Sequence, residues 1–290
     1  MRRMPYPDEL PTAMSRFQTG FTLIEAVMVI AITGVIAAVV AVFIRAPVQG
    51  YLDSSRRAAL TDIADTAVRR MSRDLHLALP NSVRNAAGSS CIEFLPTITG
   101  GRYRAEQDCS AGCSGDKLDF DAADTGFDVL SPMSSVPAVG DTVAIYNLGV
   151  PGADAYAGDN TAIISTPSAG HLAFSSKLFP FVSPGNRFQI IPAADSVVSY
   201  VCRDAGTDAS GNGTGILYRY SNYATSATAA ITCPVPPAAT PILANRVSAC
   251  NFVYASEVTS RAGLVSLQLS ITENNETVRL YHEVHVNNVP

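Results

Sequence analysis

The sequence has little of what nucleic-acid-binding proteins and enzymes require. Only 16% of its 290 residues are charged and the formal net charge is −5 at pH 7, whereas a nucleic-acid surface needs a basic domain. It contains no Gly-x-Ser-x-Gly nucleophile motif. The glycine-rich stretch 211–215 lies between two strand-like segments and opens no helix, so we interpret it as a turn and not as a phosphate loop. The sequence therefore predicts no nucleic-acid partner, no enzyme and no cofactor.

Metal-binding patterns are also incomplete. His282 and His285 lie on one predicted strand and point to opposite faces, so the two rings do not converge on one ion. The aspartates between residues 119 and 128 lack the spacing and the glycine of an EF-hand loop. We expect no metal site, with calcium at these aspartates as the alternative.

All six cysteines lie beyond residue 90, on one side of the apolar segment described below. In an exported, oxidising compartment they would form disulfides. Zinc binding is the alternative for three of them, but no fourth ligand lies near in sequence. We expect Cys202–Cys233 as a local bridge and Cys109–Cys113 as a second one. The full set of candidates is Cys91, Cys109, Cys113, Cys202, Cys233 and Cys250.

One long apolar run follows Gly20 and continues to Ile44, with Glu25 as its only charged residue. A helix of this length can cross a bilayer core. A secretory signal differs, because its apolar core is shorter, carries no acid and ends in small residues. An unpaired carboxylate in the membrane costs about 2.5–3.5 kcal/mol and so requires a cationic partner. Cleavage after Gly20 would create that cation at the amino terminus of Phe21, four residues from Glu25.

The hexapeptide Gly20-Phe21-Thr22-Leu23-Ile24-Glu25 resembles the prepilin-type signal of type IV pilins and type II secretion pseudopilins. In that family, prepilin peptidase cleaves after the glycine and methylates the new terminal phenylalanine. The glutamate pairs with the terminal amine of a neighbouring subunit during assembly. The resemblance implies these roles for Gly20, Phe21 and Glu25. It also implies prepilin peptidase, other pilin subunits and an inner-membrane assembly platform as partners. A plain single-span anchor is the alternative.

The resemblance implies a definite topology. Residues 1–20 would be a cytoplasmic leader, and residues 21–44 would cross the inner membrane once, in contact with lipid, before assembly. A periplasmic head would then enter the pilus, at its tip. Arg2, Arg3 and Arg16 lie on the leader side of the apolar run, in agreement with the positive-inside rule. The start codon stays open between Met1, Met4 and Met14.

We expect one long helix over residues 21–79, interrupted and kinked at Pro47. Its first half, 21–44, would form the transmembrane segment and later the filament core. Its second half, 48–79, is amphipathic, and Arg70 and Asp74 form one of its i,i+4 pairs. Pro80 would end the helix. The expected apolar stripe comprises Val48, Leu52, Ala59, Ile63, Ala67, Met71, Leu75 and Ala78.

The remaining residues, 80–290, predict an antiparallel β head. Apolar residues alternate over 264–271, as in a strand that covers the apolar stripe, and Asn274-Asn275 would turn this strand into the next. The stretch 224–241 is predicted to be a surface loop. The fold class is therefore α+β, with a long N-terminal helix packed on a C-terminal sheet. The predicted strands are 91–95, 117–120, 142–146, 171–174, 187–191, 197–202, 216–220, 247–254, 264–272 and 277–286.

Further segments resemble the minor pilins of the mannose-sensitive haemagglutinin (MSHA) pilus. They are 56–62, 78–84, 94–97 with 100–104, and 280–286. This resemblance implies a low-abundance subunit that initiates or caps the pilus. A head as large as residues 80–290 agrees, since it would crowd a tightly packed shaft. The alternatives are a type II secretion pseudopilin and a tip adhesin whose head binds a surface ligand.

Overall fold

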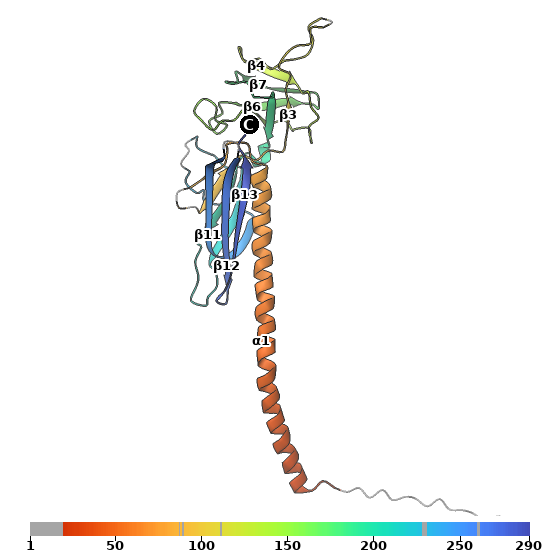
Figure 1. Ribbon diagram of the computed structural model, residues 1–290, viewed down its shortest axis with the longest axis vertical. Helices are drawn as coiled ribbons and strands as arrows, with labels where there is room; N and C mark the ends of the chain where they lie inside the picture. Colours follow the sequence, from red (N-terminus) through yellow and green to blue (C-terminus); the bar gives the residue numbers. More distant parts are fainter. Residues whose placement is uncertain (1–19, 87, 89, 111, 228–230, 260–261) are drawn as a thin grey trace, which may run out of the picture. The chain divides into compact units, whose positions relative to one another are not determined.

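The computed structural model describes residues 20–290, except 87, 89, 111, 228–230 and 260–261, with Ala46 and 257–259 described for the main chain alone. The expected leader thus lies, apart from Gly20, outside the described residues. The chain divides into two units, residues 1–55 and 56–290. Each unit is described by itself. The fold class is α+β, as predicted: one long N-terminal helix is followed by antiparallel sheets (Figure 1).

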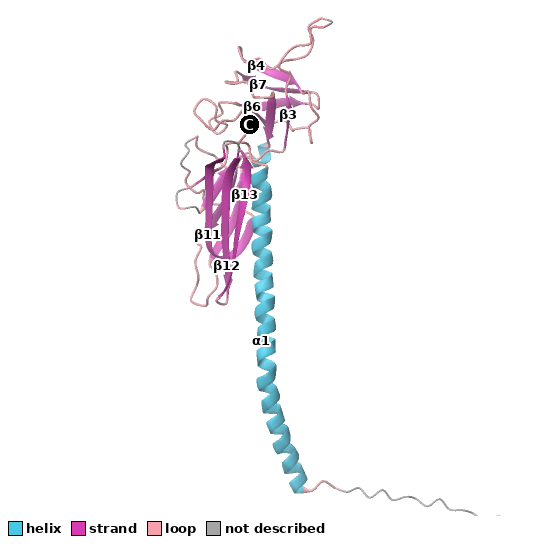
Figure 2. Cartoon of the chain, viewed as in Figure 1, coloured by secondary structure: helices cyan, strands magenta, loops and turns pink. Residues whose placement is uncertain are grey.

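Helix α1 (Leu23–His76) begins in the first unit and continues into the second. In the first unit every described side chain from Gly20 to Ser55 is exposed. The predicted interruption at Pro47 is wrong, because the helix continues through this residue (Figure 2). A proline removes one main-chain hydrogen bond, and the helix nevertheless stays continuous across Pro47.

The buried face of α1 differs from the predicted stripe. Ala67, Met71 and Leu75 are buried as expected, whereas Val48, Leu52 and Ala59 are exposed. The stripe begins only at Leu60, where the sheet starts to cover the helix. The buried position is thus Leu60 and not the neighbouring Ala59 of the prediction. Its buried members are Leu60, Ala64, Ala67, Val68, Met71 and Leu75.

The helix ends at His76, three residues before the expected end at Leu79. Ala78 forms a bridge with Pro96, and the Leu79 amide donates to the Leu95 carbonyl over 2.7 Å. The chain thus leaves the helix to pair with the residues after β2, so the Leu79 amide bonds to that segment instead of to a helical carbonyl.

A seven-stranded antiparallel sheet packs on the second-unit part of α1. Val265, Leu267, Leu269 and Ile271 of the predicted alternating segment are all fully buried in the core shared with the helix. The hairpin at 274–275 is confirmed, because Asn274 and Asn275 have φ values of 51° and 64° between β12 and β13. The strands, in spatial order, are β1 (Arg84–Asn85), β2 (Cys91–Phe94), β9 (Val198–Arg203), β10 (Gly215–Ser221), β11 (Ile242–Thr259), β12 (Ala262–Glu273) and β13 (Glu276–Asn287).

A second sheet of six strands has its own aromatic core, which the sequence did not predict. The outer strands β3 and β4 are joined where they end. Arg104 N donates to Asp128 O (2.9 Å), and Leu130 N donates to Arg102 O (2.8 Å). The sheet therefore curls around its core and links its own edges. The spatial order is β3 (Thr99–Arg102), β8 (Arg187–Ile191), β5 (Thr142–Ile145), β6 (Thr161–Pro167), β7 (His171–Lys177) and β4 (Asp124–Asp128).

One predicted strand is wrong, and four observed strands were not predicted. The segment 117–120 is irregular, and Leu118 N donates to the Arg104 carbonyl while Asp119 N donates to the Asp124 carboxylate. Conversely, β1, β3, β4 and β6 were not predicted. A short 3-10 helix, η1 (Ala193–Asp195), precedes β9.

All six cysteines are paired, as Cys91–Cys233, Cys109–Cys113 and Cys202–Cys250. The predicted Cys202–Cys233 bridge is therefore wrong, and so is the zinc alternative. The physical reason is strand register: Cys91 lies opposite Val201, the neighbour of Cys202 in β9. Cys91 and Cys202 consequently point to opposite faces of the sheet. Cys233 packs with Cys91 on one face, and Cys202 belongs to the helix-side core.

Candidate functional site

The residues of the hexapeptide lie at the start of α1. Gly20, Phe21 and Thr22 precede the helix, and Phe21 is 80% exposed. Thr22 is the cap: its Oγ1 accepts a hydrogen bond from Glu25 N over 3.4 Å and its carbonyl accepts one from Ala26 N over 3.1 Å. Glu25 lies in the first helical turn, where the helix dipole favours a negative charge. Cleavage after Gly20 would leave the new amine one helical turn from this carboxylate.

Thr22 and Glu25 also have the spacing of a capping box, in which a glutamate three residues after a threonine cap stabilises the helix start. We did not predict this structural role. The pattern Thr-x-x-Glu before an apolar run is the signal that could have revealed it. In a capping box the Glu25 carboxylate would bond the Thr22 amide, in addition to the role that the resemblance implies.

An apolar surface without cover follows this cap. Helix α1 contains an 18-residue window with a mean hydropathy of 3.0, none of which is buried, and it is long and apolar enough to cross a membrane. An uncovered apolar surface of this size marks a site of contact with lipid or with other proteins. The exposed side chains at its start include Phe21, just before the helix, and Leu23, Ile24, Val27 and Met28 in the first turns.

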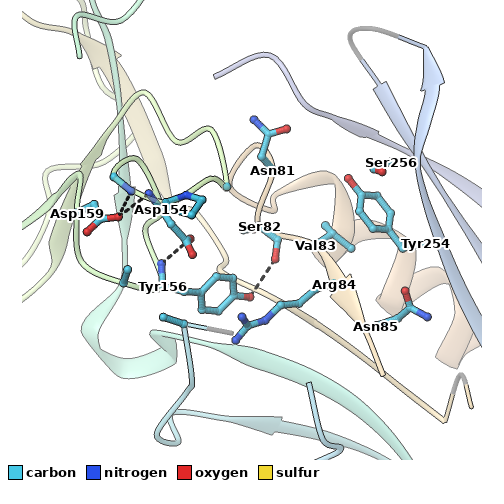
Figure 3. Close-up of a pocket in the computed structure, with 15 residues that line it drawn as sticks. Asn81, Ser82, Val83, Arg84, Asn85, Asp154, Tyr156, Asp159, Tyr254 and Ser256 are labelled. Carbon is cyan, nitrogen blue, oxygen red and sulfur yellow. Dashed lines mark hydrogen bonds between the residues drawn. The ribbon is translucent and has the colours of Figure 1, made fainter. Parts of the chain in front are cut away.

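A cavity of about 750 Å³ in the head lies beside Arg84 and Tyr156 (Figure 3). The Arg84 guanidinium is 3.5 Å from the centre of the Tyr156 ring and 2.6 Å from Glu93 Oε1. The Tyr156 hydroxyl donates to Ser82 O, and Asp159 Oδ2 accepts from Gly152 N. Burial, followed by the nearby Glu93 charge, raises the pKa of Tyr156 well above its usual value. These polar groups already have partners within the fold.

Arg84, which lines this cavity, also belongs to a buried hydrogen-bond network. Tyr223 donates to Glu93 Oε2 over 2.5 Å and lies 2.5 Å from Ser199 Oγ. Burial and the Glu93 carboxylate raise the pKa of Tyr223. The Arg84 and Glu93 side chains are only 12% and 4% exposed. The network therefore stabilises the packing of β1, β2 and β9, and its contacts do not resemble a set of reacting groups.

A second buried network joins α1 to the sheet. Asp74 Oδ2 accepts from the Tyr200 hydroxyl over 2.7 Å and from Arg219 Nε over 2.9 Å, and Arg219 also pairs with Asp195. The sequence assigned Asp74 to an exposed i,i+4 pair with Arg70. Its partners come from β9 and β10, which no local pattern reveals.

The residues weighed as metal ligands are separate or already bonded. Among the residues that the structure describes, no group of three or more His, Cys, Asp or Glu side chains is close enough to hold an ion. Asp119 Oδ1 accepts from Asp121 N, which lowers the pKa of Asp119, and Asp128 pairs with Arg104. His282 lies opposite Leu267 and His285 opposite Leu264.

Residues 15–41 match the family model described as the prokaryotic N-terminal methylation motif. Comparisons with curated proteins and with solved structures gave no match. The matched range contains Gly20, Phe21, Glu25 and the first turns of α1. This motif implies processing by prepilin peptidase and assembly with other pilins. Together with one N-terminal helix that is long and apolar enough to cross a membrane, the motif supports a pilin-type or pseudopilin-type subunit and fits a single-pass membrane protein.

Proposed function

We propose that this chain is a minor type IV pilin of an MSHA-like pilus. Prepilin peptidase would cleave it between Gly20 and Phe21 and methylate the new amine of Phe21. The subunit would then help to initiate or cap the pilus. The single observation that carries this proposal is the hexapeptide from Gly20 to Glu25 within the matched motif, followed directly by an uncovered apolar helix.

Each part of the chain has a role in this proposal. Residues 1–20 are the leader, 21–44 are the membrane segment and later the filament core, 48–79 are the half of the helix that carries the head, and 80–290 are the periplasmic head. The segments 56–62, 78–84, 94–97 with 100–104, and 280–286 resemble the minor pilin MshO. The two sheets of the head support a place at the tip, where there is room for a bulky subunit.

Glu25 acts in assembly under this proposal. Its carboxylate would pair with the amine of Phe21 in a neighbouring subunit, in a filament core from which water is excluded. An unpaired ion there costs several kcal/mol. Ion pairing would thus favour the incorporation of a correctly processed subunit over an uncleaved one.

The test is a deletion of the gene, complemented with the wild-type chain or with a variant that blocks cleavage, Gly20→Leu. Gly20→Ala is the matched control because its side chain is small. We expect wild-type and Gly20→Ala to restore surface pili and Gly20→Leu to leave an uncleaved protein and few pili. Equal piliation in the deletion strain and in the wild type would contradict the proposal.

A type II secretion pseudopilin is the second candidate, because the same methylation motif occurs in both systems. The same deletion strain distinguishes the two. Loss of pili with normal protein secretion favours the minor pilin. Loss of secretion with normal pili favours the pseudopilin.

A further inference from the structure

Strand β13 forms a long open edge of the seven-stranded sheet. It is the last strand in the spatial order and pairs with β12 alone (Figure 1). It has 12 residues, whereas the outer strands β1, β3 and β4 have 2, 4 and 5. Proteins usually protect such an edge by keeping it short or by placing a proline, a lysine or a bulge in it. Strand β13 contains no proline and no lysine, and its register with β12 shows no bulge.

The turn before β13 determines which of its main-chain groups are free. Asn274 and Asn275 both have positive φ values, as in a two-residue type I′ hairpin. In such a turn the Glu276 amide bonds to the Glu273 carbonyl, so the main chain of Glu276 faces β12. Hydrogen-bonded and non-hydrogen-bonded pairs then alternate along the antiparallel ladder. Every second residue from Thr277 to His285 therefore points its amide and its carbonyl away from β12.

These outward groups have no partner within the chain. Among the described residues, no main-chain group of 276–287 bonds outside the ladder with β12. A row of unpaired amides and carbonyls is a template for one more strand. The arginine and the glutamate of this row, Arg279 and Glu283, have opposite signs. Their charges cancel, so the row does not repel a second strand.

A basic groove of about 610 Å³ lies between α1 and His282 of β13. Arg73, His76 and His282 line it with exposed side chains, and none of the three has an ion pair among the described residues. The one carboxylate in its lining, Asp65, pairs with Arg69 over 2.6 Å. The helix dipole favours Arg73 and His76 in the last turn of α1. It does not account for His282, which comes from the strand.

We propose that an extended, acidic segment of a neighbouring pilin-type subunit pairs with the open edge of β13. Its main chain would bond to the outward amides and carbonyls, and a carboxylate on the side of α1 would enter the groove beside Arg73 and His282. The methylation motif implies such neighbours. Self-pairing of two copies through β13 would not supply this acid, because the helix-side carboxylate Glu276 already pairs with Arg57.

This inference rests on the proposed function and names the surface through which the subunit would contact the head of its neighbour. The two can fail separately, because processing at Phe21 is measured by mass spectrometry on the same protein. A cleaved and methylated chain without a contact at β13 contradicts this inference alone. An uncleaved chain contradicts both.

The experiment places photoreactive benzoylphenylalanine in place of Tyr281. This side chain is 63% exposed and belongs to an outward residue, within reach of a strand that pairs with β13. The full chain replaces the wild type in its own bacterium, and cross-linked products from membranes and pili are identified by mass spectrometry. We expect a product with a different protein that carries a prepilin-type signal, joined through a head segment that contains Asp or Glu.

Glu283→Pro, in the same photoreactive chain, separates main-chain pairing from side-chain contact. Proline removes the outward amide of residue 283, and the bonds to β12 stay in place. The melting temperature should therefore equal that of the matched control Glu283→Ala. We expect Glu283→Ala to cross-link like the parent chain. Glu283→Pro should cross-link about tenfold less, as expected for the loss of one main-chain bond.

Charge reversal tests the groove. Arg73→Glu should also lower the cross-link yield about tenfold, because it places a like charge beside the incoming carboxylate. Arg102→Glu, at an exposed arginine of the other sheet, should leave the yield unchanged. The proposal is overturned if no cross-link forms, if Glu283→Pro cross-links as well as Glu283→Ala, or if Arg73→Glu has no effect. It is also overturned if the cross-linked protein is a second copy of this chain or lacks a prepilin-type signal.

Discussion

Variants of Glu25 can separate the contribution to the helix start that the capping-box spacing predicts from the proposed subunit contact. Glutamine replaces glutamate in capping boxes, so Glu25→Gln keeps the cap and removes the charge. We expect Glu25→Gln and Glu25→Leu to be cleaved and inserted normally, to leave the melting temperature of the head unchanged, and to reduce surface pili severely. Thr22→Ala should cost about 1 kcal/mol of helix stability and leave piliation largely intact.

Immunoblots for cleavage and electron microscopy for pili provide the readout. Normal piliation by a normally cleaved Glu25→Gln protein would remove the charge of Glu25 from assembly. Loss of pili in Thr22→Ala to the same degree would assign the effect to the cap.

Arg84 and Glu93 form an ion pair that is almost fully buried. Removal of one partner leaves an uncompensated charge, so Arg84→Met should destabilise the head by about 3–5 kcal/mol. The double variant Arg84→Met/Glu93→Leu removes both charges and should recover much of this loss. Thermal unfolding of the three proteins measures the difference. A double variant less stable than Arg84→Met would show that the charge is not the cause.

Buried tyrosines predict how stability depends on alkaline pH. Burial raises the pKa of Tyr156, Tyr200 and Tyr223 in the folded state above the ordinary value of 10.0. The folded state then holds protons that the unfolded state releases, so stability is fully present below pH 10 and falls as the pH rises above it. Tyr223→Phe should reduce this fall. Chemical unfolding at pH 8 to 11 measures it, and an equal slope in the variant would contradict the assignment.

At the scale of elements, the helix face is the part that sequence periodicity describes least accurately. Leu60 is fully buried and Leu52 is half exposed, although the sequence placed Leu52 on the apolar stripe and left Leu60 out. Leu60→Ala should cost about 2–5 kcal/mol, and the matched change Leu52→Ala should stay within about 0.5 kcal/mol. Thermal unfolding of the two variants in detergent measures both losses of stability. Equal costs would contradict the observed phase of the helix.

Strands with regular alternation could be predicted and strands without it could not. Segments 187–191 and 264–272 were predicted because their apolar residues recur with a strand's period. Strand β3, with the sequence Thr-Gly-Gly-Arg, has two residues that are depleted in strands. Its glycines are explained by the close approach of Phe188, a contact that depends on tertiary structure.

At the scale of the whole molecule, long-range disulfides hold the head together. Cys91–Cys233 spans 142 residues and Cys109–Cys113 only 4. Replacement of both members of the first pair by serine should cost about 2–5 kcal/mol and expose the 224–241 segment to proteolysis. The same change at Cys109 and Cys113 should cost much less. Alkylation of the denatured, non-reduced wild type should label no cysteine, and labelling of four or more would contradict the disulfide assignment.

The methylation motif could be recognised from the sequence, since the roles proposed for Gly20, Phe21 and Glu25 depend on their spacing along one short segment. The long-range pairings in the head could not be predicted. The disulfide partners of Cys91 and Cys202 and the partners of Asp74 depend on strand register, and a shift of one residue moves a side chain to the other face.

The central claim is that the mature subunit begins at Phe21. Mass spectrometry of the protein purified from membranes tests it most directly, because the terminal peptide reports both the cleavage position and any added methyl group. We predict a terminal peptide that starts with N-methylated Phe21 and contains Glu25. A mature protein in which Phe21 is internal, with no cleavage after Gly20, would contradict the assignment of this chain as a pilin-type subunit.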